Sequence, residues 1–403
     1  MTLRACCLDD LLEPEHEARA VWSFVERLDL SELYRAIRSV EGGAGHPAAD
    51  PKVLVSLWLY ATLRGVGSAR ELARLCEEHV AYEWLCGGVG VNHHTLSDFR
   101  TGHVAWLDAT LTAAVAVLLH RGVVTLERVA QDGVRVRASA GAASFRRAAS
   151  LAACEATAAA QIAALRAELE ADPTAGERRR RAARERAARE RLGRVEAALA
   201  ALPEAEARAR RNGGGEARVS TTDAQARVMK MADGGFRPAY NVQFAADTGA
   251  QVVVGVDVST TGSDQPSLEP MAAQIANRYA RQPGAYLVDG GFVSLAGIER
   301  LSAQGTVVYA PPPKPRDGRD VAAAREDDSA AIAAWRARMQ TEAAKPIYRE
   351  RAATIECVNA QARRRGLTAM PVRGLAKGKA IALWHALAHN LARSLAIPVP
   401  ATA

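Results

Sequence analysis

The chain has 403 residues, of which 49% are hydrophobic and 24% charged, and this excludes a disordered chain, a collagen-like fibre and a small disulfide scaffold. A formal charge of only +7 makes the distribution of charge more informative than its sum. The N-terminus becomes acidic at once, unlike a signal peptide, and no apolar run of about 18 residues predicts a membrane span. The six cysteines show no Cys-x-x-Cys spacing, so we expect reduced thiols in a cytoplasmic protein and no structural zinc.

The pattern of residues 50–121 is helical throughout. We expect a first helix that ends at Gly65, a second that starts at a capping box on Ser68 and continues to Gly87, and a third that begins at Thr95. Three helices with short links are typical of helix-turn-helix DNA-binding domains, but ordinary helical bundles share this pattern. Both interpretations stay open.

An alternating strand over residues 129–137 is followed by a biased helical segment from about Ala148 to Arg211. A break at Asp172 and Pro173 predicts two long antiparallel helices. Residues 178–194 contain nine arginines and only two glutamates. This hairpin either contacts DNA, which would make binding strongly dependent on salt, or is a solvated surface.

A second region combines strands and helices and ends in a helical stretch. The expected elements are strands over residues 239–245, 251–259, 286–289 and 306–310, helices over 266–280 and 295–304, a polar connector over 314–344 and a last helical region over 347–396. One mixed sheet results if the strands before and after the helical insertion belong together.

Two acidic residues stand at the ends of expected strands, each followed by glycine. Asp132 interrupts an alternating strand, and Asp289 ends an apolar strand directly before two glycines. Carboxylates at the carboxyl ends of strands are a common position for metal ligands in α/β sheets, although a single Asp-Gly pair is more often a simple turn. A third carboxylate, Glu356, lies in an expected helix. Oxygen ligands without a His or Cys cluster favour Mg²⁺ or Mn²⁺ over zinc.

Eight stretches in order resemble the bacterial insertion-sequence transposases of the DDE type, in or near the family built around insertion sequence 1182 and close to the insertion sequence 4 and 5 transposases. They include VAQDGVRVRASAG, PAYNVQFAAD, YLVDGGFVS and YRERAATIE. The resemblance implies an α+β protein in which an N-terminal helical DNA-binding domain precedes a ribonuclease-H-like catalytic core with a mixed sheet. The expected domains are residues 1–122 for DNA binding, 123–145 with 216–396 for the core, 146–215 for a coiled-coil-like helical insertion and 397–403 for a tail.

The resemblance also implies roles for single residues. Asp132, Asp289 and Glu356 match the three catalytic carboxylates, which would hold two Mg²⁺ or Mn²⁺ ions. The expected DNA contacts are Tyr348 and Arg351 of the same helical signature, Arg363 where many relatives have Lys, and Arg178, Arg181 and Arg100. Related groups space the Arg and the Glu one residue closer, so Glu350 remains a rival for the third ligand.

The implied activity is metal-dependent cleavage at the ends of an insertion sequence, followed by attack of the freed 3′-hydroxyl on target DNA. A DNA-binding protein that has lost catalysis and a ribonuclease-H-like nuclease are the alternatives. The expected partners are double-stranded DNA, as terminal inverted repeats and as target, and a second copy of the chain in a dimer or larger synaptic complex. We expect a cytoplasmic, nucleoid-associated protein without a membrane.

Other polar residues receive structural interpretations. His385 and His389 have helical spacing but lack an intervening Glu at the position that a zinc protease motif requires, so we expect them to pack. We expect Asp223 and the Asn241–Gln243 stretch to line the side of the active site without binding metal. Asp264 is explained as a turn or helix cap.

Overall fold

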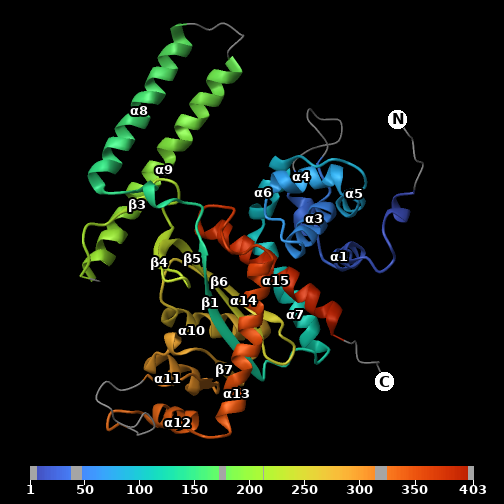
Figure 1. The fold of residues 1–403 in the computed structure, drawn as a ribbon, viewed down its shortest axis with the longest axis vertical. Coiled ribbons are helices and arrows are strands. Elements are labelled where there is room, and N and C mark those ends of the chain that lie inside the picture. Colours follow the sequence, from blue (N-terminus) through green and yellow to red (C-terminus); the bar gives the residue numbers. More distant parts are fainter. Residues whose placement is uncertain (1–6, 38–47, 172–177, 212, 314–324, 398–403) are drawn as a thin grey trace. The chain divides into compact units, whose positions relative to one another are not determined.

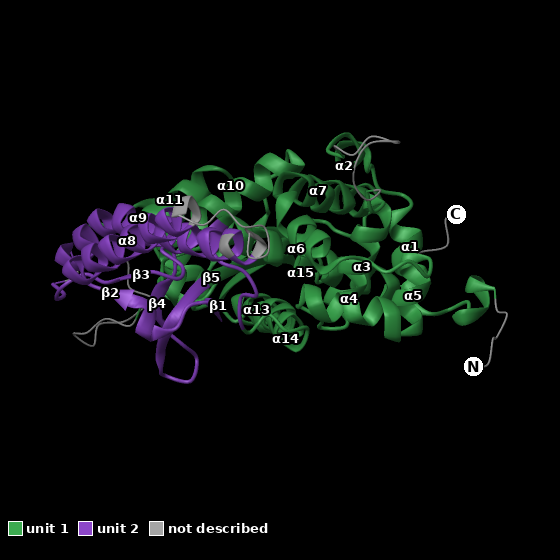
Figure 2. Cartoon of the chain, turned by 90° about the horizontal axis from the view of Figure 1, so that it is seen from above, with its two compact units in different colours: residues 1–134, 241–368, 376–403 green, residues 135–240, 369–375 purple. Residues whose placement is uncertain are grey.

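The computed structural model describes residues 7–37, 48–171, 178–211, 213–313 and 325–397. These residues belong to two compact units, which Figure 2 shows in different colours. The first unit consists of residues 1–134, 241–368 and 376–403, and the second of residues 135–240 and 369–375. The expected helical DNA-binding region and most of the expected catalytic core therefore share one unit.

The N-terminal region of the first unit is helical, as the sequence pattern predicts. Its elements are the short 3-10 turn η1 (Leu8–Leu11) and the helices α1 (Glu17–Val25), α2 (Ser31–Arg35), α3 (Pro51–Leu63), α4 (Ala69–Glu78), α5 (Val80–Cys86), α6 (His93–Gly102) and α7 (Val104–His120). The Asp50 carboxylate caps α3 by accepting from the Lys52 N–H at 2.8 Å, and the Ser68 hydroxyl caps α4. Nearly all of α3 is buried, so it forms the centre of this region.

Two of the expected helices are broken at histidines. His79 adopts an extended backbone conformation that ends α4, and its ring accepts from the Ala81 N–H at 3.2 Å to start α5. His103 separates α6 from α7, whose axes differ in direction by 64°. The predictions of one continuous helix in each place were therefore wrong. At His79 the side chain serves as an N-cap acceptor without any sequence signature of a break, whereas at His103 the backbone leaves the helical conformation without a side-chain cap.

The strands form the mixed sheet that the sequence predicts. Its members are β1 (Arg128–Arg137), β4 (Arg227–Lys230), β5 (Phe236–Asp247), β6 (Val253–Ser259), β7 (Ala285–Leu287) and β8 (Val307–Tyr309). The order is β6-β5-β1-β7-β8, and β4 pairs with the beginning of β5. β5 and β6 are antiparallel, whereas β1, β7 and β8 are parallel. The parallel connections use helices α10 (Leu268–Tyr279) and α11 (Leu295–Ala303), as parallel strands require a crossover.

The chain after β8 is more helical than expected. Helix α12 (Ala330–Met339) lies within the segment that we expected to be a polar connector. The last helical region is divided into α13 (Ala344–Arg351), a π-helical turn η6 (Ala352–Glu356), α14 (Cys357–Arg364) and α15 (Leu375–Ala396). Most of α15 is buried, and the Trp384 indole donates to the Arg100 carbonyl at 3.0 Å. Helix α15 therefore joins the N-terminal helices to the core of the first unit.

The second unit contains the expected helical hairpin, in which α8 (Ala148–Ala171) and α9 (Arg178–Arg211) run side by side (Figure 1). Small apolar clusters hold the hairpin together, one of them formed by Ile162, Leu165 and Ala188. Two short strands that the sequence did not reveal, β2 (Phe145–Arg146) and β3 (Val219–Ser220), pair at its base. By length and composition alone, α8 is the one described helix apolar enough to cross a membrane, or one of two if the bent pair α6 and α7 counts as a single span, and core helices of soluble proteins pass the same test.

Candidate active site

Parallel strands β1 and β7 place Asp132 and Asp289 next to each other. Ala130 of β1 pairs with Leu287 of β7, and each aspartate follows its strand's paired residue by two positions. Because neighbouring strands lie about 4.8 Å apart, the two residues lie at the same level of the sheet, one on each strand. The negative charge of Asp289 contributes to a raised pKa of Asp132, which agrees with this proximity. Two carboxylates that are far apart in the sequence thus meet at one edge.

The Asp132 carboxyl group is half-buried and held from two sides. It accepts from the Gly133 N–H at 2.8 Å through one oxygen and from the Asn359 side-chain amide at 3.1 Å through the other. Burial raises the pKa of Asp132 to about 6, and the negative charges of Asp289 and Asp264 contribute in the same direction. The Gly133 N–H and the positive charge of Arg351 oppose this rise in pKa. A bound cation would therefore stabilise the ionised form of Asp132, which burial and the neighbouring carboxylates destabilise.

Asp264 is a fourth carboxylate at this site, and the interpretation as a simple turn or cap overlooked it. It is buried, and one oxygen accepts from the side-chain amides of Asn241 and Gln243, each at 2.7 Å. A Cβ at Gly133 would lie 2.2 Å from that oxygen, so only glycine permits β1 to pass so close. The sequence nevertheless contained a signal for such a residue. Asn241 and Gln243 place two amides on one face of an otherwise apolar, buried strand, and buried amides require a polar partner.

The helical segment after α12 brings the signature residues together through its π-helical turn. Arg351 donates to a Glu356 oxygen at 3.0 Å, and its guanidinium lies 5.9 Å from the centre of the Tyr348 ring. In an α-helix, residues five apart point in different directions, whereas a π-helical turn has i to i+5 hydrogen bonding and brings them to one face. The extra residue between Arg351 and Glu356, compared with related groups, coincides with this turn.

Glu356 and its rival Glu350 have different surroundings. The Glu356 side chain is 56% exposed and paired with Arg351, which in turn lowers the pKa of Asp132 by its charge. Glu350 forms an ion pair with Arg128 at 2.8 Å and accepts from the Thr248 hydroxyl at 2.9 Å. Arg128 begins β1 and lies four residues before Asp132 on the same strand. The Glu350 carboxylate is therefore held at the start of β1. The two candidates for the third carboxylate thus differ in their partners, which are Arg351 for Glu356 and Arg128 with Thr248 for Glu350.

The donor atoms suit a hard divalent cation. In the described part of the chain, no group of three or more His, Cys, Asp or Glu side chains is already arranged to hold a metal, since Glu356 is directed to Arg351. The amide oxygens of Asn241 and Asn359 are nevertheless buried without a hydrogen-bond partner. Asn359 contacts Asp132, and the Asn241 oxygen would lie 2.7 Å from a Cβ at Gly133. Carboxylate and amide oxygens of this kind fit Mg²⁺ or Mn²⁺.

The expected DNA contacts differ in their accessibility. Arg363 is exposed and lies seven residues after Glu356, two helical turns further along. Arg100 instead is 5% exposed, stacks on Trp58 at 4.7 Å and donates to the Gly67 carbonyl, while burial lowers its pKa to about 10. This position gives Arg100 a packing role and not a DNA contact. The side chains of Arg178 and Arg181 lie outside the described part of the structure.

Three other polar residues of the sequence analysis have clear positions. His385 and His389 are buried, as the packing interpretation predicts, and burial lowers their pKa values to about 3 and about 4. Asp223 belongs to the second unit, where it accepts from the Tyr240 hydroxyl at 2.8 Å and from the Gly374 N–H at 3.1 Å. It therefore organises a loop of that unit.

The site thus defines a mixed α+β protein with paired carboxylates at a sheet edge, and comparison with known families agrees with this class. Residues 6–102 match the family described as "Transposase domain (DUF772)", and residues 313–395 match the family described as "Transposase DDE domain". No curated protein and no solved structure matches the chain. The two family matches support an insertion-sequence transposase of the DDE type. Glu356 and the helical signature lie within the second match, while Asp132 and Asp289 lie outside both.

Proposed function

We propose that the protein is a DDE transposase of or near the insertion sequence 1182 family, with a ribonuclease-H-like core that cleaves the ends of an insertion sequence and joins them to target DNA. The observation that carries this proposal is the pairing of Asp132 and Asp289 on parallel strands, beside the helix that holds Tyr348, Arg351 and Glu356. The strand order β6-β5-β1-β7-β8 supports a ribonuclease-H-like arrangement of this sheet.

Asp132, Asp289 and Glu356 would hold the divalent ions, which when bound supply activation of the attacking oxygen and stabilisation of the leaving oxygen at the scissile phosphate. Asn359 orients the Asp132 carboxylate by its amide hydrogen bond at 3.1 Å. Asp264, held by Asn241 and Gln243, keeps the backbone at Gly133 in place. Arg351 balances the charge of Glu356 and lies close enough to Asp132 to lower its pKa.

DNA would approach the exposed side of this helical segment. Tyr348, Arg351 and Arg363 offer one aromatic ring and two guanidinium groups, which are suited to contacts with the sugar-phosphate backbone. A dimer or larger synaptic complex that bridges two inverted repeats, and an association with the nucleoid, belong to the same proposal.

A strand-transfer assay with Mg²⁺ and a duplex that carries the inverted repeats flanking this gene tests the proposal. A transposase releases the 3′-hydroxyl end and forms joined products. Hydrolysis without joining would instead identify a nuclease with the same core. Binding without cleavage would identify a DNA-binding protein derived from a transposase, and either result would contradict the proposed activity.

A further inference from the structure

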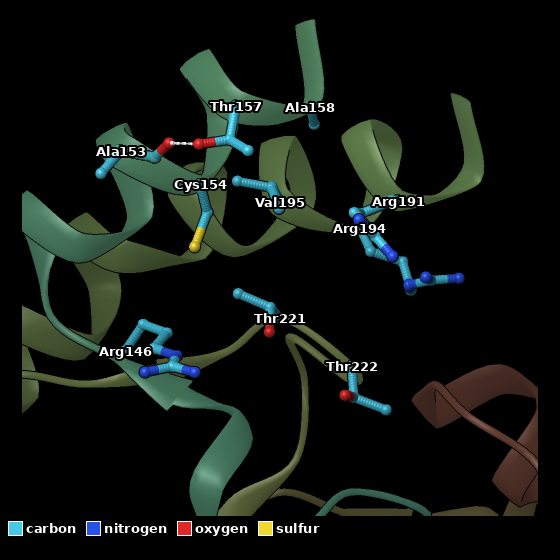
Figure 3. A pocket seen from close by; sticks show the side chains of 10 residues that line it. All are labelled: Arg146, Ala153, Cys154, Thr157, Ala158, Arg191, Arg194, Val195, Thr221 and Thr222. Carbon is cyan, nitrogen blue, oxygen red and sulfur yellow. Dashed lines mark hydrogen bonds between the residues drawn. The ribbon is translucent and has the colours of Figure 1, made fainter. Parts of the chain in front are cut away.

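The second unit contains a pocket whose chemistry the proposed active site does not use. The pocket has a volume of about 370 Å³ and lies at the base of the helical hairpin. Its lining includes the side chains of Arg146, Cys154, Arg191, Arg194, Thr221 and Thr222, and also Thr157, whose hydroxyl donates to the Ala153 carbonyl. Figure 3 shows Arg191 and Arg194 on one side, Arg146 on the other, and the two threonines on the loop between them. Every one of these residues belongs to the second unit.

The base of the pocket is fixed by hydrogen bonds. Arg146 pairs with Val219 in the small antiparallel sheet of β2 and β3. The Ser220 hydroxyl lies 2.7 Å from the Ser144 hydroxyl and accepts from the Thr222 N–H at 3.1 Å. These contacts hold the loop after β3 in one conformation, so a ligand would meet a prearranged surface and bind at a small entropic cost.

Two of the three guanidinium groups of the pocket have no carboxylate partner among the described residues. Arg191 donates to the neutral Gln161 side chain at 3.2 Å, and no ion pair in the described part of the chain involves Arg146. Arg194 pairs with Glu190 at 3.8 Å, much as Arg166 pairs with Glu185 and Arg184 with Glu168 elsewhere in the hairpin, but no carboxylate lines the pocket itself. The pocket thus concentrates positive charge.

We propose that this pocket binds a phosphate group of the DNA backbone. Arginine forks and hydroxyl donors without a competing carboxylate are the chemistry that selects phosphate over neutral ligands. The proposal rests on the proposed function, because a transposase supplies duplex DNA as the source of that phosphate. It assigns the base of the hairpin, including the last two arginines of the run over residues 178–194, to the interface with DNA.

The test compares two triple variants of the full-length protein by binding to inverted-repeat duplex at several salt concentrations. The first variant is Arg146→Ala with Arg191→Ala and Arg194→Ala. The control is Arg166→Ala with Arg208→Ala and Arg237→Ala, which removes the same charge from arginines of the same unit that are paired with Glu185, Glu204 and Asp233. Circular dichroism and thermal unfolding establish that both variants are folded.

We expect the pocket variant to bind duplex roughly tenfold more weakly near 0.1 M salt, because each lost phosphate contact removes about 0.9 from the slope of log K against log[salt]. The magnitude of the slope should fall by about one to two, and the control should keep the wild-type slope. The free thiol of Cys154 gives a second measurement. Bound duplex should protect Cys154 from alkylation, whereas inorganic phosphate at millimolar concentration should protect it much less.

Equal affinities and slopes for the two variants would overturn the proposal, as would unchanged alkylation of Cys154 in the DNA complex. Protection by inorganic phosphate without protection by duplex would make the pocket a site for free phosphate and would also overturn it. If the wild type and both variants all bind duplex tightly, the proposed phosphate site in the pocket is contradicted, but the proposed function is not. A wild-type protein that binds no duplex contradicts the proposed function and the pocket together.

Discussion

At the scale of single residues, the ionised carboxylate of Asp132 serves the proposed catalysis but lowers the stability of the metal-free folded protein. Its pKa in the folded protein is about 6, against an ordinary value of 3.8, so the folded state holds the proton more tightly than the unfolded state. The stabilising contribution of the protonated form is complete below about pH 4 and is lost as the pH rises through 6. At neutral pH the ionised carboxylate therefore destabilises the metal-free protein.

We predict that Asp132→Asn abolishes DNA cleavage but stabilises the metal-free protein by about 1–2 kcal/mol at pH 8, because the buried charge is removed. At pH 5 the gain should fall to about half of its value at pH 8, because the carboxyl group is still ionised in the unfolded state there, and it should vanish only below about pH 4. Chemical unfolding of both proteins at the two pH values measures this difference. A gain of the same size at pH 5 would show that the charge of Asp132 is not its cause.

A second prediction concerns Gly133. In Gly133→Ala the new Cβ would lie 2.2 Å from the Asp264 oxygen and 2.4 Å from the Gln243 amide nitrogen, so buried hydrogen bonds must break or β1 must move. We expect a loss of about 2–4 kcal/mol in stability and a strong loss of cleavage. Gly193→Ala is the control, because a Cβ at Gly193 meets no atom within 4 Å and alanine favours the helix. Equal stability of the two variants would argue against the tight packing at Gly133.

At the scale of elements, the sequence predicted what depends on local signals. The N-terminal cap at Ser68 and the strand that carries Asp132 both appear in the structure. The breaks at His79 and His103 escaped prediction, because neither the cap that the His79 ring provides nor the uncapped bend at His103 leaves a local sequence signal. The π-helical turn had one indirect signal, the extra residue between Arg351 and Glu356.

That turn leads to a third prediction. Deletion of Ala352 should convert the π-helical turn into an α-helix in which Arg351 and Glu356 are four residues apart and still share one face. Glu356 and Asn359 should then keep their positions beside Arg351 and Asp132. Deletion of Cys357, in α14, should instead rotate Asn359 by about 100° relative to Glu356 and away from Asp132. We expect the first deletion to retain end cleavage within about threefold and the second to lower it by about 100-fold, with duplex affinity measured in parallel by a binding titration. An equal loss of cleavage in both deletion variants would contradict this role of the turn.

At the scale of the whole molecule, long-range pairing decides what the sequence alone could not show. The register of β1 with β7 brings Asp132 and Asp289 together across the helical insertion, as the pattern of strands suggested. Asp264 follows β6 in a segment of ordinary turn residues. The amides of Asn241 and Gln243 indicate that a polar partner is needed, but only the approach of that segment to Gly133 identifies Asp264 as the partner. The pocket at the base of the hairpin likewise depends on two strands too short to leave a sequence pattern.

The paired carboxylates are proposed to perform metal-dependent chemistry on DNA, and end cleavage by Asp289→Ala measures whether they do. The wild type and the variant are compared on inverted-repeat duplex with Mg²⁺, with Mn²⁺ and with a chelator, and duplex affinity is measured in parallel. We expect the wild type to cleave only with a divalent ion, and the variant to bind duplex with near wild-type affinity but to release no 3′ end. Metal-dependent cleavage at the wild-type rate by Asp289→Ala would contradict the proposed chemistry.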